Sequence, residues 1–95
     1  MPDDAFEWDE IKAAKNYAFH GVSFEAAKEV FKDPFAIEWC DDREPYGEDR
    51  FVIIGMVEGR LLYVAYTMRG DVIRIISARG AESYEKRRYH EENSR

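Results

Sequence analysis

The feature that most constrains the fold is a series of three segments, between residues 50 and 80, that are rich in β-branched and aromatic residues. These segments are 51–57, 60–68 and 72–79, and they are separated by Glu58-Gly59 and by Arg69-Gly70-Asp71. Glycine after a polar residue favours the tight turns of β-hairpins, because these turns need a positive φ that glycine adopts without strain. The sequence therefore predicts an antiparallel meander of three strands in this part of the chain.

The preceding residues carry the spacing and the capping signals of two helices. Asp9 is a candidate N-cap of a first helix that ends near Gly21, and Ser23 is a candidate N-cap of a second helix. Apolar residues at helical intervals follow Ser23, and Asp33-Pro34 ends this segment because proline cannot continue a helix.

Three further segments complete the predicted order of elements. Residues 6–8 alternate apolar and acidic side chains as in a short edge strand, residues 35–40 are expected to form a strand, and residues 81–92 a polar helix. The order β-α-α-β-β-β-β-α predicts a single α+β domain over residues 1–95. In this fold the two N-terminal helices cover one face of a twisted antiparallel sheet.

The composition is that of a globular domain. With 95 residues, 45% of them hydrophobic, the chain can form a core without disulfides. Its single cysteine, Cys40, has no partner for an internal disulfide, and no stretch approaches the ~18 apolar residues of a membrane span. No secretory signal is visible, so we expect a cytoplasmic protein without membrane association.

The net charge of −6 argues against a nucleic-acid-binding protein, because phosphate contacts come from lysine and arginine. The charge is unevenly distributed, however. Residues 1–50 hold 14 acidic and 6 basic residues, whereas residues 51–95 hold 6 acidic and 8 basic ones. The second half can therefore present a local basic surface that the mean charge conceals.

Two arginines, Arg74 and Arg79, lie within an otherwise apolar predicted strand. Strict alternation directs their side chains to opposite faces of the sheet, unless a bulge intervenes. An arginine on an uncovered face simply reaches water, and this alternative stays open for Arg74. Arg79, beside Gly80 at the end of the strand, can bind a phosphate or pair with a carboxylate.

The chain contains two histidines, the side chains best suited to proton transfer near neutral pH. His20 ends the first predicted helix, where it can transfer protons or stabilise the negative end of the helix dipole. His90 lies in a polar helix, and we expect it to be solvated. Neither metal-ligand spacing nor a phosphate-binding glycine motif is present, so we predict no metal and no cofactor.

Short matches to one protein family are spread along the chain. They are Phe6-Glu7-Trp8-Asp9, Lys12, Asn16, His20-Gly21-Val22-Ser23-Phe24-Glu25-Ala26, Val30-Phe31, Asp33-Pro34, Gly47-Glu48, Arg50, Ile54-Gly55, Tyr66-Thr67, Arg69, Ile73-Arg74-Ile75-Ile76-Ser77-Ala78-Arg79, Ala81, Glu85 and Tyr89. With these residues the chain resembles the BrnT family of type II toxins over residues 6–89, most specifically in the runs 20–26 and 74–79. One position departs from the family pattern, because Phe19 stands where a lysine usually precedes His-Gly.

The resemblance implies a RelE-like fold, with a compact sheet that has helices on one side, and an activity as an RNA-cleaving growth inhibitor. It also implies a partner, a BrnA-type ribbon-helix-helix antitoxin that blocks the toxin and binds operator DNA, so that the pair represses its own operon. An alternative is a weak or inactive homologue that acts as an antitoxin-binding corepressor.

Roles for individual residues follow from the chemistry of such an enzyme. Metal-independent RNA cleavage needs a base that removes the 2′-hydroxyl proton and fixed cations that stabilise the charge on the phosphoryl oxygens. We assign the phosphate to Arg79 and Arg74, proton transfer to His20, orientation of these groups to Glu85, and RNA contacts to Lys12, Arg50, Arg69 and Tyr89. Two of these residues have structural alternatives: Glu85 can tie the last helix to the sheet through Arg79, and Tyr89 can pack in the core.

Overall fold

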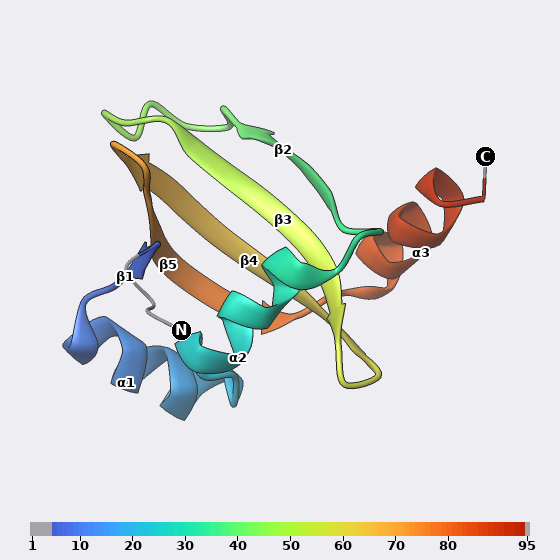
Figure 1. The fold of residues 1–95 in the computed structure, drawn as a ribbon, viewed down its shortest axis with the longest axis horizontal. Helices are drawn as coiled ribbons and strands as arrows, with labels where there is room; N and C mark the ends of the chain where they lie inside the picture. The colour runs from blue at the N-terminus through green and yellow to red at the C-terminus, as the bar shows by residue number, and fades with distance from the viewer. Residues whose placement is uncertain (1–4, 95) are drawn as a thin grey trace.

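The computed structural model describes residues 5–94 of the chain (Figure 1). Its elements follow the predicted order, and their bounds are β1 Phe6–Glu7, α1 Glu10–His20, α2 Phe24–Glu29, the 3₁₀ turn η1 Val30–Lys32, β2 Ile37–Asp41, β3 Arg50–Val57, β4 Arg60–Arg69, β5 Val72–Gly80 and α3 Ser83–Glu92. The predicted α+β fold class is confirmed. Among these helices none is long and apolar enough to cross a membrane.

The strands form one sheet with the order β1-β5-β4-β3-β2. The predicted meander of β3, β4 and β5 is confirmed, and Gly59 and Gly70 in its two turns have φ values of 80° and 61°. The expectation of a purely antiparallel sheet is wrong at one edge, since β1 pairs in parallel with β5. A parallel pair needs a long connection, and here the chain passes through both helices and enters the sheet again at the far edge with β2.

Local capping chemistry fixes the two N-terminal helices as the sequence predicts. The Asp9 carboxylate accepts a hydrogen bond from the Ile11 N–H at 2.8 Å, and the Ser23 hydroxyl accepts one from the Ala26 N–H at 3.0 Å. Gly21 ends α1 in the left-handed conformation, with φ at 72°. The second helix is shorter than expected, because its last turn narrows into η1 before Pro34.

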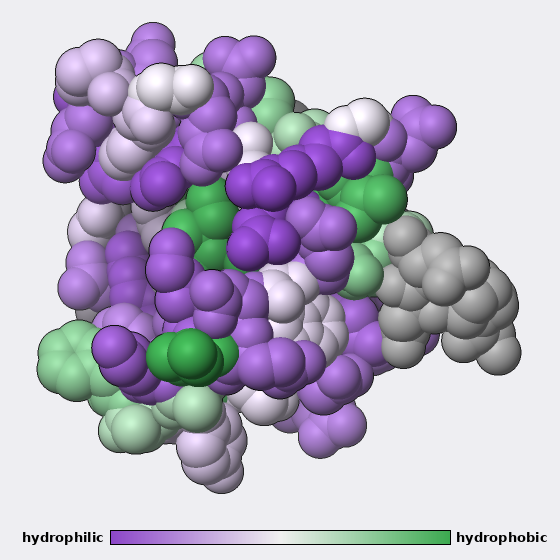
Figure 2. Space-filling model, turned by 90° about the vertical axis from the view of Figure 1, so that its left-hand side faces the viewer, coloured by the Kyte–Doolittle hydropathy of each residue, from purple (hydrophilic) through white to green (hydrophobic). Residues whose placement is uncertain are grey.

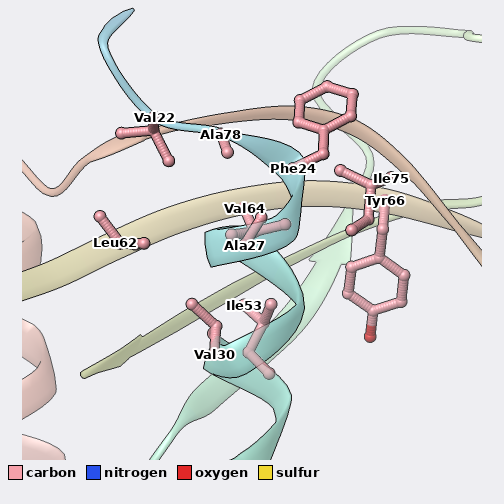
Figure 3. Packing of buried hydrophobic residues seen from close by; sticks show 10 residues of the cluster. All are labelled: Val22, Phe24, Ala27, Val30, Ile53, Leu62, Val64, Tyr66, Ile75 and Ala78. Carbon is pink, nitrogen blue, oxygen red and sulfur yellow. The ribbon is translucent and has the colours of Figure 1, made fainter. Parts of the chain in front are cut away.

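Both N-terminal helices lie on the same face of the sheet, here called the first face (Figure 1). Figure 3 shows that α2 directs its apolar side chains onto the central strands, and the buried cluster consists of Val22, Phe24, Ala27, Val30, Ile53, Leu62, Val64, Tyr66, Ile75 and Ala78. Each fully buried aliphatic side chain of this kind stabilises the fold by about 1.5–3 kcal/mol. This cluster is the larger part of the core.

The C-terminal helix packs on the opposite side, here called the second face. The buried ring of Tyr89 in α3 belongs to a second cluster with Val52, Ile54, Leu61 and Tyr63. The family resemblance implied that the helices lie on one side of the sheet. In the structure they lie on both sides. The strands carry apolar side chains on both faces of the sheet, and each of these faces therefore has to be covered by helices.

A β-bulge in β5 changes where the two strand arginines point. Ala65 of β4 pairs with Ser77 and the next residue of β4, Tyr66, pairs with Ile75, so Ile76 is one extra residue in β5. The extra residue reverses the alternation of side chains beyond it. Arg74 and Arg79 consequently lie on the same face, the second face, and not on opposite faces as strict alternation predicts.

Candidate active site

A pocket of about 610 Å³ lies where the C-terminal end of α1, the start of β4, the end of β5 and one side of α3 meet. Its wall contains five basic or titratable nitrogen-bearing side chains, from His20, Arg60, Arg79, Lys86 and His90. Met56, Gly59, Leu61, Gly80, Ala81 and Glu82 complete the lining. We call this site the cationic pocket, because Glu82 is the one carboxylate among its lining residues.

Hydrogen bonds and a ring contact fix the position of the Arg79 side chain. Its guanidinium donates to both carboxylate oxygens of Glu85 at 2.9 Å and to the carbonyl of Gly80 at 3.1 Å, and it lies 3.9 Å from the centre of the Tyr63 ring. Of the five N–H groups of an arginine, these bonds use three. Two N–H groups therefore have no acceptor among residues 5–94 and are available to a ligand in the pocket.

Glu85 is buried, with 3% of its surface exposed, yet it stays ionised. Burial alone would raise the pKa of its carboxyl group, but the hydrogen bonds from Arg79 and from the Glu82 N–H outweigh burial and lower this pKa. The hydrogen bond with Glu85 in turn raises the pKa of Arg79 above its ordinary value. The pair thus places a permanently charged guanidinium at a fixed position, and it also ties α3 to β5.

The position of His20 depends on a buried amide in α1. The Asn16 side chain donates to the carbonyls of Ala78 and Val22 at 2.8 and 2.9 Å, and its oxygen accepts from the Ala78 N–H at 3.1 Å. Asn16 thereby replaces a neighbouring strand at the edge of β5 and fixes the last turn of α1 against it. This clamp brings His20 into the pocket wall that also contains Arg79.

Three residues of the cationic pocket were not singled out for function from the sequence: Arg60, Lys86 and His90. His90 was expected to be merely solvated, and it is exposed, but it lines the pocket. A signal for Arg60 lies in Gly80, because a Cβ atom at this glycine would come within 2.7 Å of the Arg60 guanidinium. A side chain at position 80 would thus displace the flexible end of Arg60 from its place in the pocket.

Lys12 lies outside the cationic pocket but close to it. It lines a second hollow of about 320 Å³ together with Lys15, Asn16, Phe19, His20 and Ile76, here called the α1 groove. His20 belongs to the walls of both sites. The two hollows are therefore adjacent.

Arg74 and Arg50 lie in one row across the second face, since each pairs with Thr67 of β4. Arg74 forms an ion pair with Glu7 at 3.0 Å, and Arg50 forms one with Glu48 at 3.2 Å. The structure does not bring them into the cationic pocket with Arg79. Their ion pairs are partly exposed, as the solvated alternative for Arg74 requires.

Arg69 is exposed at the end of β4, next to the turn that leads into β5. Figure 2 shows the end of the molecule that carries this turn and the 42–49 loop, and its surface is mostly hydrophilic with a few small apolar patches. Arg69 is therefore accessible to a ligand but distant in the fold from the pocket residues at the other end of β4.

Tyr89 is a core residue in this structure. Its side chain is buried, and its hydroxyl donates to the Asp33 carboxylate at 2.7 Å. Burial and this hydrogen bond raise the pKa of Tyr89 to about 12. The geometry thus corresponds to the structural alternative for Tyr89, which does not line the cationic pocket.

Among residues 5–94, the structure contains no group of three or more His, Cys, Asp or Glu side chains that could hold a metal ion. The donors that do converge are nitrogen cations and imidazoles. Side chains of this kind bind anions and exchange protons, and the cleavage of a phosphodiester uses both properties.

Comparison with known proteins points to the same chemistry. A family model described as the ribonuclease toxin, BrnT, of a type II toxin-antitoxin system matches residues 8–85, which contain nine of the eleven residues that line the cationic pocket and the Arg79–Glu85 pair. No curated protein matches the sequence individually. Because the family model spans most of the chain, the protein belongs to the BrnT family of ribonuclease toxins of type II toxin-antitoxin systems.

Proposed function

We propose that this chain cleaves RNA without a metal ion, at a phosphodiester bound in the cationic pocket. The observation that supports this proposal is the convergence of both histidines of the chain with Arg60, Arg79 and Lys86, from four separate elements, on one hollow. His20 and His90 are 70 positions apart in the sequence, and the fold alone brings them to the same site.

The reaction is an attack of the 2′-hydroxyl on the neighbouring phosphorus. One imidazole, His20, removes the 2′-hydroxyl proton as the oxygen attacks, the bond from phosphorus to the 5′-oxygen breaks, and a second imidazole, His90, gives a proton to this leaving oxygen. The products are a 2′,3′-cyclic phosphate and a free 5′-hydroxyl. Arg79 donates its two remaining N–H groups to the phosphoryl oxygens, where negative charge accumulates.

Other charged residues act on the substrate or on Arg79 from a distance. Glu85 is a positioning residue, because its carboxylate fixes the guanidinium plane of Arg79. Lys12, Arg50, Arg69 and Arg74 are proposed to hold the flanking phosphates of the RNA, since all four lie outside the pocket and at least partly exposed.

The family is that of type II systems, in which a protein antitoxin accompanies the toxin. We propose that the partner is a BrnA-type ribbon-helix-helix protein, which blocks the toxin, binds operator DNA and thereby represses the shared operon in the cytoplasm. The acidic first half of the chain suits a basic partner.

The first test is expression of the chain without an antitoxin, together with an RNA cleavage assay on the purified protein in EDTA. We expect growth arrest and RNA ends that carry cyclic phosphate. Growth arrest in cells, together with cleavage by the purified protein that is lost in EDTA, would contradict metal independence. Normal growth, no cleavage and tight antitoxin binding would instead establish the corepressor alternative.

The second test uses variants of the pocket. Arg79→Lys keeps a positive charge beside Glu85 but loses the bidentate contact with phosphate. We expect the rate of cleavage to fall by a factor of about 10²–10³. The matched control is Arg87→Ala, which removes an exposed arginine of α3 outside the pocket and should leave activity unchanged. His20→Ala and His90→Ala should each remove one limb of a bell-shaped pH profile, and an unaltered profile in either variant would remove that histidine from the mechanism.

A further inference from the structure

The α1 groove contains an apolar side chain in an unusual position. Phe19 has 83% of its surface exposed, the largest value among the large hydrophobic side chains of residues 5–94. A fully solvated phenylalanine contributes nothing to the core, and aromatic residues at such positions often mark a binding site. The ring is therefore a candidate contact for a ligand.

Two cations lie in the same groove as this ring. Lys12, Lys15 and Phe19 lie three to seven positions apart on α1, a spacing that places them along one side of a helix, and all three line the α1 groove. Among residues 5–94, neither lysine ammonium group has a carboxylate within 4 Å. A flat apolar surface beside two positive charges is complementary to a nucleobase and an adjacent phosphate.

The groove is continuous with the cationic pocket. The rings of Phe19 and His20 are in edge-to-face contact, with their centres 4.7 Å apart, and His20 lines both hollows. A base that stacks on Phe19 therefore belongs to a nucleotide directly beside the one whose phosphate occupies the pocket.

We infer that Phe19, together with Lys12 and Lys15 of the same groove, is a base-stacking subsite for single-stranded RNA next to the cleavage site. This inference rests on the proposed function and adds a substrate class to it. Stacking on an aromatic side chain requires an unpaired base, because the bases of a duplex are already stacked on each other. The subsite selects single strands and is tolerant of base identity.

The test measures binding of a fluorescent single-stranded oligoribonucleotide with 2′-O-methyl groups, which lacks the attacking hydroxyl and cannot be cleaved. Phe19→Ala is expected to raise Kd by roughly 5- to 150-fold, the usual effect of removing one stacking contact. Phe19→Trp should bind at least as tightly as the wild type, whereas Phe19→Leu should be as weak as Phe19→Ala. The ring is exposed, so none of these changes affects the core.

Three controls isolate the stacking contact. Tyr17→Ala removes another exposed aromatic ring of α1 that does not line the groove, and it should leave Kd unchanged. A duplex of the same sequence should bind the wild type and Phe19→Ala equally. An oligonucleotide with one abasic position at the stacked nucleotide should lose the difference between these two proteins.

Each outcome decides between the explanations. An unchanged Kd in Phe19→Ala, or full binding by Phe19→Leu, would overturn the stacking subsite. Loss of antitoxin binding in Phe19→Ala with normal oligonucleotide binding would assign the ring to the protein partner and also overturn it. If the wild type binds the oligonucleotide through Phe19 but does not cleave unmodified RNA, the proposed reaction fails and the subsite stands.

Discussion

The buried amide of Asn16 offers the sharpest test of how the fold positions the site. In Asn16→Ala, the N–H and the carbonyl of Ala78 and the carbonyl of Val22 all lose their partner. Ala78 and Val22 are 0% and 3% exposed, so water cannot replace the amide fully. A buried polar group without a partner costs about 1–3 kcal/mol, and even at the lower bound the three groups together cost about 3 kcal/mol.

A loss of this size is a large fraction of the total stability of a small domain, which is about 5–15 kcal/mol. It corresponds to a fall in Tm of roughly 12–24 °C, since each kcal/mol shifts the Tm of a domain of this size by about 4–8 °C. Thermal and urea unfolding followed by circular dichroism measure both quantities. At a temperature where the variant is still folded, cleavage should also fall, because the clamp fixes His20.

The matched control is Asn93→Ala. The Asn93 amide also donates to two carbonyls, those of Phe35 and Tyr89, but it lies on the exposed end of α3. Water can satisfy these carbonyls, so we expect a loss below about 1 kcal/mol. If Asn16→Ala were no more destabilising than Asn93→Ala, the argument that Asn16 replaces a strand neighbour of β5 would be refuted.

Two further predictions concern α3. Glu85→Gln leaves Arg79 partly buried without its counter-charge, and we expect it to destabilise the fold by about 3 kcal/mol at pH 7, as measured by urea unfolding. Because the folded protein lowers the pKa of Glu85, this pair stabilises the fold at pH values above the ordinary pKa of a glutamate. Its contribution disappears as the pH falls through the lowered pKa. The stabilities of wild type and variant should therefore converge in acid. A constant difference down to pH 2 would exclude this origin of the stability. Tyr89→Phe removes the hydrogen bond to Asp33, whose carboxylate keeps its bonds from the Met56 and Phe35 N–H groups. We expect the free energy of unfolding to fall by about 1 kcal/mol, with unchanged RNA binding. Weakened RNA binding at full stability would instead make Tyr89 an RNA contact.

The parts of the fold that the sequence predicts correctly are those set by neighbouring residues. The turns at Gly59 and Gly70 and the caps Asp9 and Ser23 depend on the chemistry of two to four consecutive residues. The parallel pairing of β1 has no such signal, because its two residues meet β5 more than 60 positions later in the chain. The pattern of residues 6–8 indicates a strand but contains no information on its neighbour.

The bulge at Ile76 explains why the site could be predicted only in part. Ile76 has the same β-branched character as the residues around it, so no residue type marks it as the extra one. The bulge depends on how β5 is aligned with β4, which is decided by the packing of the whole sheet. Arg79 and His20, both assigned to catalysis from the sequence, line the same pocket, whereas Arg60, Lys86 and His90 become visible as their neighbours only when four elements are assembled.

The net charge of −6 is compatible with an RNA-binding site because many carboxylates are already used inside the fold. The carboxylates that bind backbone N–H groups, hydroxyls or guanidinium groups of the same chain include Glu7, Asp9, Asp33, Glu38, Asp41, Glu48 and Glu85. The Arg43 guanidinium, for example, holds the pKa of Asp41 low, at about 2.

The remaining negative charges act on RNA only over a short range, since salt at physiological concentration screens exposed charges beyond about 8 Å. A phosphate bound in the cationic pocket, as we propose, is therefore influenced mainly by Arg60, Arg79 and Lys86, which are in its wall. The acidic remainder of the surface reduces the attraction at a distance and leaves the contact itself favourable. RNA binding should accordingly be weak, local and strongly dependent on salt, and its specificity should come from the fixed geometry around Arg79 more than from the overall charge.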